Sequence, residues 1–489
     1  MRHFILLLTF ITPVFNLNAQ ELRYITGAKI ENYDNIYFRL FRQDEHALYA
    51  YSYVKPDFYI DIFDKEKLQA AAHIKIPFPS KDSISFSVED LFILQDRYLA
   101  FYSYFDKSEK SEKLEMIAFD KKGSRIGEPK LIDNSEGKNE RRAGAFAVFN
   151  RPAEHKFLSY GFKKIKRSNY INIDHFDYAG NKLKSQDFVV NNSWGVVLAT
   201  FNDDSYIRLI RGSAGKWNLQ WEVNIYSPAS SEARVIRLRK PEAATLFVSD
   251  MFRSYIDDND MLHLLSPYIT SALSEKAVGL YHAKIDLKTQ TLIKEAVIPF
   301  KTGTALNADD ADFNLSSGVL THLIATKNGL RAIFESRLMT STYGVPTQYR
   351  IGNVIAFDLD SNDVAQDIKV LRKKQNTSPA KMNYSSFTTL NHNDTTYCVY
   401  NELPENLQRS DSRLKNVNGN RIDETVVVYA NLSSDPVKSN ILIDKAGKSG
   451  TDAVMPGTSI KDTFKKGTLY ILRRINNEVY LTKIFRDPL

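Results

Sequence analysis

The sequence predicts an all-β protein built from a repeated unit of antiparallel strands. Short stretches of alternating apolar and polar residues, rich in Tyr, Phe, Ile and Val, run from end to end of the chain, and almost no segment has the apolar spacing of about 3.6 residues that is typical of helices. A strand that ends in Phe-Asp recurs along the chain. With 43% hydrophobic and 12% aromatic residues among 489, the chain has enough apolar material for a large core, which argues against a disordered protein.

The recurring turn follows each strand that ends in Phe-Asp. Leu114–Asp120 is followed by Lys-Lys-Gly, Tyr170–Asp177 by Tyr-Ala-Gly, and Val354–Asp358 by Leu-Asp-Ser-Asn. Asp favours turns because its carboxylate accepts hydrogen bonds from backbone N–H groups two residues on, and Gly123 and Gly180 supply the positive φ of a tight hairpin. We therefore expect these aspartates to be structural, with little to suggest a set of catalytic acids.

A partner strand precedes each turn strand, which makes eight copies of the unit. The copies are spaced by about 50 to 70 residues, which leaves room for four strands in each. The expected partner strands are Ala47–Tyr53, Tyr98–Tyr104, Lys156–Phe162, Tyr206–Arg211, Met261–Leu265, Leu330–Glu335, Thr396–Tyr400 and Thr468–Arg473. Such a unit buries both faces of its sheet only by stacking on its neighbours, and a closed ring leaves no unprotected end. The repeat form resembles that of β-propellers.

The two ends of the chain complement each other in this repeat. The last copy, Thr468–Arg473 and Glu478–Phe485, lacks a fourth strand. At the other end, Leu22–Ile30 precedes Ile36–Phe41, the expected inner strand of the first blade, and is a strand to spare. We predict a β-propeller of four-stranded blades, eight in number with seven as the alternative, whose ring is closed by the N-terminal strand.

The start of the chain has the order of a signal peptide. The basic Arg2 precedes the apolar run Phe4–Ile11, and a polar and small segment ends at Ala19. We expect cleavage near that alanine, with residues 1–19 as the signal peptide and residues 20–489 as one propeller domain. The apolar run is shorter than the roughly 18 residues of a membrane span, so we expect no integral membrane segment after cleavage. The ending Asn-Ala-Gln resembles signal peptides of Bacteroidota, which implies a periplasmic or extracellular protein.

Compact motifs of common enzymes and metal sites are absent from the sequence. The one cysteine, Cys398, lies in an apolar-alternating strand and cannot form an internal disulfide, so we expect a buried, inert thiol. The histidines lack the short spacing of metal ligands, and no phosphate-binding or dinucleotide-binding loop occurs, so we predict neither a metal site nor a cofactor. A net charge of +7 among 65 basic and 58 acidic residues permits an anionic partner without requiring one, and for an exported chain we expect no nucleic acid partner.

Long loops and basic residues gather on one predicted face. In a propeller, the loops between blades share a face with the loops that join the second and third strands of a blade, and the latter are long at Leu338–Arg350 and Leu403–Arg421. The same face collects a group of basic residues that we call the basic rim: Arg141, Arg142, Lys163, Lys164, Lys166, Arg167, Arg409 and Arg413. The basic rim is the predicted binding site for an acidic glycan or an acidic protein face. The alternative is a solvated run of charges, because acidic neighbours dilute the patch.

Two functional hypotheses follow from this pattern. The first is a non-enzymatic binding or scaffolding propeller that presents its loop face to a glycan or an envelope protein. The alternative is a polysaccharide hydrolase or lyase, in which carboxylates converge at the central channel. The candidate pairs combine Glu89 or Asp90 with Asp309, Asp310 or Asp312. Beyond these pairs, the sequence assigns no catalytic residue.

Overall fold

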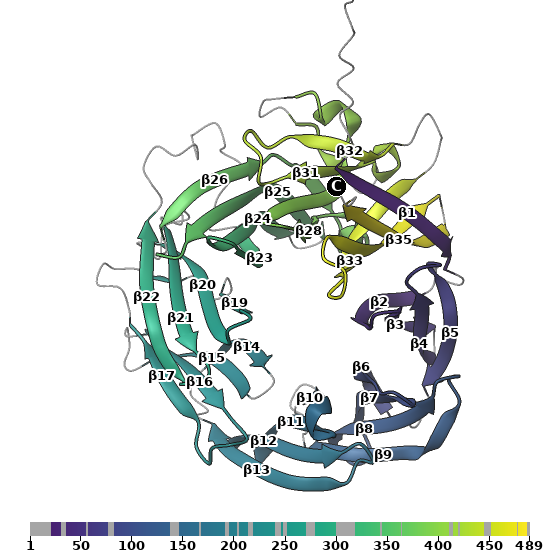
Figure 1. Ribbon diagram of the computed structural model, residues 1–489, viewed down its shortest axis with the longest axis vertical. Coiled ribbons are helices and arrows are strands. Elements are labelled where there is room, and N and C mark those ends of the chain that lie inside the picture. Colours follow the sequence, from purple (N-terminus) through teal and green to yellow (C-terminus); the bar gives the residue numbers. More distant parts are fainter. Residues whose placement is uncertain are drawn as a thin grey trace, which may run out of the picture.

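Strands joined by short turns make up nearly all of the described chain. In the computed structural model, successive strands pair into antiparallel sheets, and eight of these sheets stand around a ring as the blades of a β-propeller (Figure 1). The predicted fold class and the predicted number of blades are confirmed. The structure describes residues 21–486 with gaps at 31–35, 55–56, 77–82, 137–145, 166–167, 191–194, 203–204, 214–218, 240–245, 248–251, 270–278, 300–317, 343–344, 363, 410–413, 419–420, 445–450 and 477. The predicted signal peptide lies outside these residues.

Blades 1 to 4 each contain four strands in chain order, from the inner to the outer edge of the sheet. Blade 1 is β2 (Ile36–Gln43), β3 (Ala47–Val54), β4 (Asp57–Asp64) and β5 (Gln69–Ile76). Blade 2 is β6 (Ser83–Ile93), β7 (Arg97–Asp106), β8 (Ser111–Asp120) and β9 (Arg125–Glu136). Blade 3 is β10 (Phe146–Arg151), β11 (Lys156–Ile165), β12 (Ser168–Asp177) and β13 (Lys182–Val190), with the 3₁₀ turn η2 (Pro152–Glu154). Blade 4 is β14 (Gly195–Asn202), β15 (Ser205–Ser213), β16 (Leu219–Tyr226) and β17 (Arg234–Leu238).

Blades 5 to 8 depart from this pattern in their details. Blade 5 has two short inner strands, β18 (Leu246–Phe247) and β19 (Arg253–Ile256), then β20 (Met261–Ile269), β21 (Gly279–Asp286) and β22 (Thr291–Pro299). Blade 6 is β23 (Gly318–Thr326), β24 (Gly329–Thr342), β25 (Val345–Asp360) and β26 (Ala365–Leu371). Blade 7 is β28 (Thr388–His392), β29 (Thr395–Glu402), β31 (Val426–Asn431) and β32 (Ser439–Ile443). Blade 8 is β33 (Asp452–Lys461), β34 (Thr468–Ile475), β35 (Glu478–Arg486) and β1 (Leu22–Lys29).

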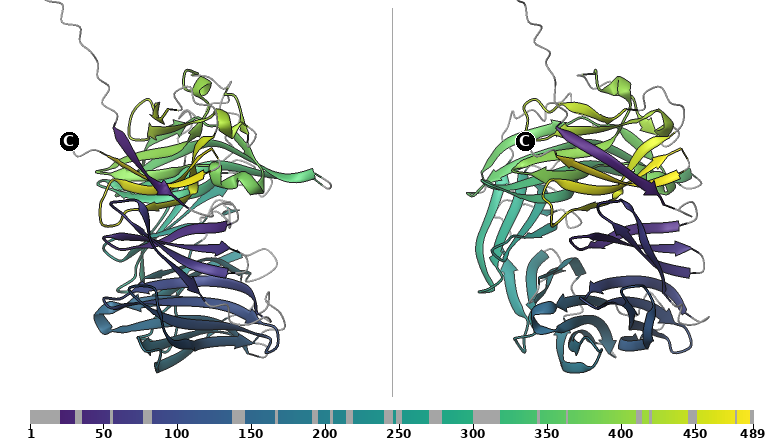
Figure 2. Two further views of the ribbon diagram at one scale, coloured as in Figure 1. Left: turned by 90° about the vertical axis from the view of Figure 1, so that its right-hand side faces the viewer. Right: turned by 45° about the vertical axis from the view of Figure 1, so that its right-hand side comes forward.

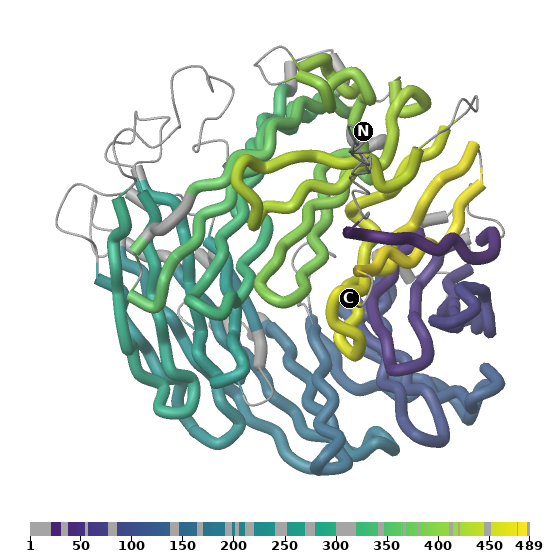
Figure 3. The backbone as a smooth tube through the Cα atoms, turned by 45° about the horizontal axis from the view of Figure 1, so that its top comes forward, coloured from purple at the N-terminus to yellow at the C-terminus, as the bar shows by residue number. Residues whose placement is uncertain are grey.

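The N-terminal strand closes the ring as predicted. β1 pairs antiparallel with β35, from Leu22 opposite Arg486 to Lys29 opposite Tyr480, so the two ends of the chain lie in one sheet (Figure 3). The Leu22 side chain is fully buried in a cluster with residues of blades 7 and 8. The ring therefore closes through hydrogen bonds and through apolar packing at the same place.

All eight predicted partner strands are second strands of their blades, and the predicted turn chemistry is present beside them. Asp120 accepts hydrogen bonds from the backbone N–H groups two and four residues on, at 2.9 and 2.8 Å. Asp177 does the same at 2.9 and 2.8 Å. Gly123 and Gly180 have φ values of +86° and +75°, which a side chain would strain. These aspartates are structural, as the sequence indicates.

The third predicted turn lies two residues later than expected. β25 continues past Asp358 to Asp360, and the Asp360 carboxylate accepts from the N–H groups two and four residues on, at 2.8 and 2.9 Å. Asp358 instead receives two hydrogen bonds from the guanidinium of Arg331, at 2.6 and 2.8 Å. The segment Asp-Leu-Asp offers two carboxylates, and the pairing of Gly329 with Asp360 decides which of them caps the turn.

Apolar cores lie between neighbouring blades, because each sheet buries its faces against the next sheet in the ring. Ile60 of blade 1, for example, shares a cluster with Ala100 and Ile117 of blade 2. Cys398 is fully buried between blades 6 and 7, so the predicted burial of its thiol is confirmed, and burial raises the pKa of that thiol.

Basic side chains on the outer strands reach to the turn of the next blade. Lys130 of β9 donates a hydrogen bond to the carbonyl of Ala179 at 2.6 Å, and Lys184 of β13 donates to that of Pro228 at 3.2 Å. Arg234 of β17 reaches the β21–β22 turn in the same way. These contacts, here called the outer latches, join blades 2 to 5 at their periphery.

Blade 6 carries additional structure on the face of the long loops. Its β24–β25 hairpin runs beyond the end of β23, and its tip projects from the ring (Figure 2). After β26, the short strand β27 (Gln375–Thr377) pairs with β25, and the 3₁₀ helix η6 (Pro379–Tyr384) follows. The hairpin contains the predicted long loop Leu338–Arg350, which is mostly strand. This extra layer leads directly into blade 7.

Candidate functional site

A long insertion joins the second and third strands of blade 7. It contains the loop predicted at Leu403–Arg421 and runs from the end of β29 to the start of β31. Its described parts form two 3₁₀ turns, η7 (Pro404–Asn406) and η8 (Ile422–Glu424), and the short strand β30 (Val417–Asn418). β30 pairs in parallel with β27, so the insertion is tied to blade 6 as well as to its own blade.

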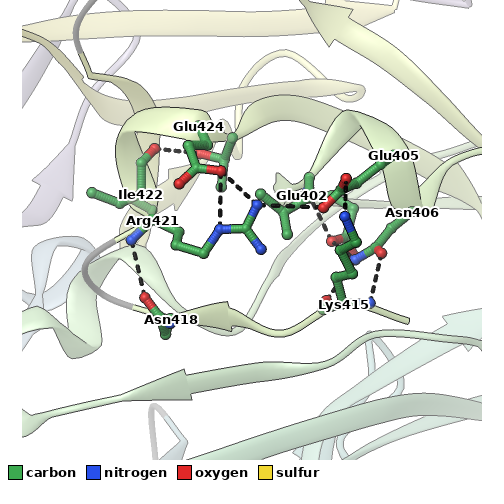
Figure 4. Close-up of polar contacts among 10 residues, drawn as sticks. Glu402, Glu405, Asn406, Lys415, Asn418, Arg421, Ile422 and Glu424 are labelled. Atoms are coloured by element: carbon green, nitrogen blue, oxygen red, sulfur yellow. Dashed lines mark hydrogen bonds and ion pairs between the residues drawn. The ribbon is translucent and has the colours of Figure 1, made fainter. Parts of the chain in front are cut away.

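One buried asparagine organises the first half of the insertion (Figure 4). The amide nitrogen of Asn406 donates to Glu402 Oε1 at 2.7 Å and to the carbonyl of Lys415 at 2.8 Å. Its amide oxygen accepts from the Lys415 backbone N–H at 2.8 Å. Because a buried polar group with all its hydrogen bonds made favours a single arrangement, this residue holds the loop in one conformation over the end of β29.

Ion pairs hold the outer side of the insertion (Figure 4). Glu405 contacts Lys415 Nζ at 2.6 Å and Arg421 Nη2 at 3.3 Å, and Arg421 also contacts Glu424 at 2.5 Å. These side chains are partly exposed, so water screens each pair and its contribution to stability is small. Their main consequence is that much of the basic charge of this loop is already neutralised within the loop.

Beneath the insertion lies a pocket of about 540 Å³, which we call the blade 6–7 pocket. It is bounded by the end of β26, the end of β29, the insertion and the start of β32. The lining combines apolar and polar side chains in similar measure: Val370, Leu371, Arg372, Tyr400, Glu402, Asn406, Leu407, Gln408, Arg409, Leu414, Pro436, Val437, Lys438, Ser439 and Asn440. Pockets of this size typically bind small ligands or the end of a chain.

Glu402 is the one carboxylic acid among the described residues of this lining. Its side chain is almost fully buried, and burial raises its pKa to about 7, against the opposing effects of the Asn406 hydrogen bond, the Leu403 N–H and the charge of Lys373. Near neutral pH, the residue is therefore divided between its acid and its carboxylate forms. A carboxyl group with a pKa close to the working pH is a common feature of functional sites.

Three cationic side chains complete the lining. Arg372 follows β26 and is half-buried, whereas Arg409 and Lys438 are exposed at the mouth of the pocket. With Glu402 protonated, the described lining has three positive charges and no negative charge.

A rigid polar layer supports the inner wall of the pocket. Lys373, next to Arg372, is completely buried and lies 2.5 Å from the carboxylate of Glu335. Asn401, next to Glu402, donates to the carbonyl of Val454 at 2.8 Å and accepts from its N–H at 3.0 Å. The neighbours of the two central lining residues are thus fixed to blades 6 and 8.

The described residues of the predicted basic rim lie in two separate blades. Its described members are Lys163 and Lys164 in blade 3 and Arg409 in blade 7. Three blades lie between blade 3 and blade 7 in either direction, so the two groups lie on opposite sides of the ring (Figure 1). Lys163 is paired with Asp133 of β9 at 2.6 Å, and only Arg409 lines the blade 6–7 pocket. The other rim residues lie outside the described residues: Arg141, Arg142, Lys166, Arg167 and Arg413.

The carboxylates predicted for a channel enzyme are held by neighbouring side chains where they are described. Asp90 on β6 receives hydrogen bonds from the Arg42 guanidinium, of which the one from Nε is 2.7 Å long. Glu89 accepts a hydrogen bond from Ser103 at 2.5 Å, and burial raises its pKa. Their predicted partners, Asp309, Asp310 and Asp312, lie outside the described residues.

Sequence reasoning missed the central residues of the blade 6–7 pocket, namely Glu402, Arg372 and Lys438. The one available signal was the long insertion after β29, because the pocket lies beneath it. A second group that was missed lies between β19 and β21, where His263 is 3.1 Å from His282 and 3.3 Å from Asp257. The histidines come from different strands, so no spacing in the sequence relates them.

No protein-family model and no curated protein matches the sequence. Among solved structures, the chain is similar to the WD40 domain of SCAP from fission yeast, with 9% identity and a TM-score of 0.42 over 95% of this chain and 98% of that one. It is similar to the β-propeller domain of the Trilobed protease from Pyrococcus furiosus, with an open velcro topology (10% identity, TM-score 0.37, 84% and 96% covered). It is also similar to the polysaccharide lyase Uly1, with 9% identity and a TM-score of 0.39 over 92% of this chain and 100% of that one. These values carry no argument about function, and the fold assignment rests on the strand order.

The described residues contain neither a membrane-spanning helix nor a group of metal ligands. None of the helices in the described part of the chain is long and apolar enough to cross a membrane. No group of three or more His, Cys, Asp or Glu side chains within the described ranges is arranged to hold a metal ion.

Proposed function

We propose that this protein is an exported, non-enzymatic binding propeller that presents its loop face to a glycan or an envelope protein, with the blade 6–7 pocket as its ligand site. The observation that carries the proposal is the pocket of about 540 Å³ beneath an insertion that its own hydrogen bonds hold in place. Preorganisation of this kind lowers the entropic cost of binding.

The shape of this pocket is better suited to a glycan than to the flat surface of a protein partner. The volume is within the range of about 300–1,000 Å³ that is common for small-ligand sites. Amide and hydroxyl groups of Gln408, Ser439 and Asn440 are available for sugar hydroxyls, and Pro436 and Leu407 offer apolar surface to a ring face. A protein partner would dock on the wider loop face around the pocket.

Export is part of the proposal and is supported by the sequence of residues 1–19. Cleavage near Ala19 would leave Gln20 as the first residue, two positions before the start of β1 at Leu22. The strand that closes the ring would then remain whole. Production of the full chain in a bacterial host, followed by N-terminal sequencing of the periplasmic fraction, tests this point. The mature chain is expected to begin at Gln20.

A polysaccharide hydrolase or lyase remains the second candidate, favoured by one observation. Burial raises the pKa of Glu89, and a raised carboxyl pKa is what a general acid requires. The test is incubation of the protein with acidic and neutral polysaccharides, followed by assay for new reducing ends and for unsaturated products. Cleavage that is lost in the Glu89→Gln variant would favour the enzyme over the binding protein.

The binding proposal is tested with the purified chain of residues 20–489 on a glycan array at two salt concentrations, followed by calorimetry on the ligands that bind. Replacing Arg372 or Lys438 with Ala should weaken binding about tenfold or more, because a hydrogen bond to a charged group contributes about 1.5–3 kcal/mol. The control is Lys122→Ala, an exposed lysine on the β8–β9 turn of blade 2. Equal affinity in all three variants would place the binding site elsewhere.

A further inference from the structure

A second pocket, of about 500 Å³, lies at the inner edge of the ring, and we call it the inner pocket. Its lining comes mainly from the turns that join the first and second strands of blades 6, 7 and 8. The first strands of these blades, β23, β28 and β33, lie around the centre of the ring (Figure 1). Because the long loops join second and third strands, the inner pocket is on the opposite face. It shares no described lining residue with the blade 6–7 pocket.

One lysine in this lining has an amine without a partner. We propose that Lys461 is a nucleophilic residue that binds carbonyl compounds, such as the open-chain aldehyde of a reducing sugar, by forming an imine through its Nζ atom. This covalent site goes beyond the proposed function and does not depend on the ligand of the blade 6–7 pocket.

The amine of Lys461 has no counter-ion among the described residues. Nζ makes neither a hydrogen bond nor an ion pair there, although the lining contains two carboxylates, Asp394 and Asp462. Asp462 is paired with Lys65 Nζ at 3.1 Å and accepts from the backbone N–H two residues on, at 2.9 Å. Asp394 accepts from the backbone N–H of Lys327 at 2.7 Å. Neither carboxylate of the described lining therefore pairs with the Lys461 ammonium.

The backbone of Lys461 is fixed where blade 8 meets blade 1. Its carbonyl accepts a hydrogen bond from Gln43 Nε2 at 2.5 Å, and Gln43 Oε1 accepts from Lys65 Nζ at 2.9 Å. Lys461 is also the last residue of β33 and pairs with Leu469 of β34. Its Cα is thus held in one place, while the flexible four-carbon stem of a lysine lets Nζ reach a ligand in the pocket.

The surroundings of Lys461 favour the neutral amine. Burial lowers its pKa from 10.5 to about 8. Burial also lowers the pKa of His322 on β23 to about 3 and raises the pKa of the Cys398 thiol on β29, so both of these neighbours are neutral at pH 7. The other titratable groups around the inner pocket are Tyr255 on β19, His392 on β28, Asp394 before β29, and Asp462 and Lys466 after β33.

The protonation state decides the chemistry of Lys461, because only the neutral amine has a lone pair. At pH 7.5 about a quarter of a lysine with this pKa is neutral, against about one part in a thousand of an ordinary lysine. A lysine that is desolvated in a pocket in this way is the usual form of an amine that reacts with carbonyl compounds. The volume of the inner pocket is also within the range of about 300–1,000 Å³ for small-ligand sites.

The reaction requires only the amine and the carbonyl compound. The lone pair of Nζ attacks the carbonyl carbon, the nitrogen loses a proton and the carbonyl oxygen gains one, which gives a carbinolamine. The hydroxyl group then leaves with the second proton of the nitrogen as water, and the C=N bond of the imine forms. No electron is gained or lost overall, and addition of water reverses the reaction. Hydroxyl and amide side chains of Thr326, Asn393 and Thr395 line the same pocket and suit a ligand with several hydroxyl groups.

The first experiment uses the unaltered chain of residues 20–489. The protein is incubated at pH 7.5 with glyceraldehyde and cyanoborohydride, which reduces an imine to a stable secondary amine, and peptide mass spectrometry measures the label on each lysine. Lys461 should be labelled at least about tenfold faster than the exposed Lys122, because its larger neutral fraction outweighs the weaker nucleophilicity of a less basic amine. Labelling of Lys461 no faster than that of Lys122 would overturn the proposal.

The pH dependence gives a second measurement on the same chain. The labelling rate of Lys461 should rise from pH 6.5 and level off above pH 8.5, because its amine is then mostly neutral, whereas the rate at Lys122 should continue to rise. Galactose should give a hexose adduct at Lys461 under the same conditions. Slower labelling in the presence of inorganic phosphate, together with the absence of any aldehyde adduct, would show that Lys461 binds anions as an ammonium group, and the proposal would fail.

Two Lys to Met variants provide the matched comparison. Lys461→Met keeps a long side chain and removes the amine, so the fast labelling of the intact protein should disappear. Lys466→Met changes an exposed lysine of the same lining and should retain the fast labelling. Fast labelling that persists in Lys461→Met would assign it to another residue and contradict the proposal. The peptide measurements on the unaltered chain do not depend on the folding of either variant.

This inference and the proposed function fail in different ways. If glycans bind and depend on the blade 6–7 pocket while Lys461 is not labelled, the covalent site alone fails. If Lys461 is labelled rapidly and no glycan binds on the array, the covalent site stands and the proposed binding function fails.

Discussion

Lys373 and Glu335 lie side by side in the wall behind the blade 6–7 pocket, and both side chains are completely buried. Burial lowers the pKa of Lys373, while the nearby cations lower the pKa of Glu335, so the pair remains charged only because each partner is present. Ser386 donates a further hydrogen bond to Glu335 at 2.7 Å. At the scale of single residues, the buried polar groups are the ones that determine the stability of this wall.

Removal of one partner should therefore destabilise the protein strongly. Glu335→Leu leaves the Lys373 ammonium buried without its carboxylate, and we expect a loss of about 3–5 kcal/mol in the free energy of unfolding. The double variant Glu335→Leu with Lys373→Met removes both charges and should recover part of this loss. Urea unfolding monitored by tryptophan fluorescence measures both values. A single variant as stable as the unaltered protein would contradict the argument.

At the scale of elements, turns and latches repeat from blade to blade. The Asp turns close the hairpins at one face, and the outer latches, such as Lys130 to Ala179, join successive blades at the periphery. Both devices satisfy backbone groups that would otherwise lack a partner at the ends of strands. The turns lie within one hairpin, so the sequence predicted them. The outer latches depend on the contact of two neighbouring blades, so the sequence did not predict them.

The turn motif gives a quantitative prediction. Asp177→Ala removes a carboxylate that accepts hydrogen bonds from two backbone N–H groups, and a hydrogen bond to a charged group contributes a net stabilisation of about 1.5–3 kcal/mol where it is shielded from water. Because the turn is exposed, we expect a net loss of about 1–2 kcal/mol in chemical denaturation. Asp96→Ala is the control, since that exposed carboxylate pairs only with its neighbour Arg97 among the described residues. Its effect should be much smaller than that of Asp177→Ala.

At the scale of the whole molecule, closure of the ring depends on residues 21–30, the first described segment of the chain. β1 supplies the outer strand of blade 8, Leu22 is buried among residues of blades 7 and 8, and the Ile30 N–H donates to the carbonyl of Val479 at 2.7 Å. Lys65 of blade 1 is buried against Asp462 of blade 8 at 3.1 Å and strengthens the same junction. The pairing of β1 with β35 thus joins sequence positions more than 400 apart.

Deletion of residues 21–30 should open the ring. The outer edge of β35 would lose its partner and the core of blade 8 would be exposed, so we expect the unfolding temperature to fall by at least about 5 °C. A synthetic peptide of residues 20–30 should restore part of the stability by binding to the open blade, in proportion to its concentration. A scrambled peptide is the control. An unchanged unfolding temperature in the truncated chain would contradict the closure argument.

The sequence by itself determined the strand-rich repeat, the ring closure and the capping role of Asp120 and Asp177, and it favoured eight blades over seven. These properties depend on alternation, on local turn chemistry and on counting strands, all of which are visible along the chain. Only the tertiary structure decided that Asp360 and not Asp358 caps its turn, because the pairing with β24 sets that register.

The candidate site depended on the tertiary structure to a greater extent. Along the chain, Glu402 lies 30 positions after Arg372 and 36 before Lys438. They line one pocket because the ends of β26 and β29 and the start of β32 lie beneath the insertion. The same geometry separates the predicted basic rim, because blades 3 and 7 face each other across the ring. Sequence patterns report which residues are charged, whereas burial and the curvature of the ring decide which charges share a pocket and which carboxyl group keeps its proton.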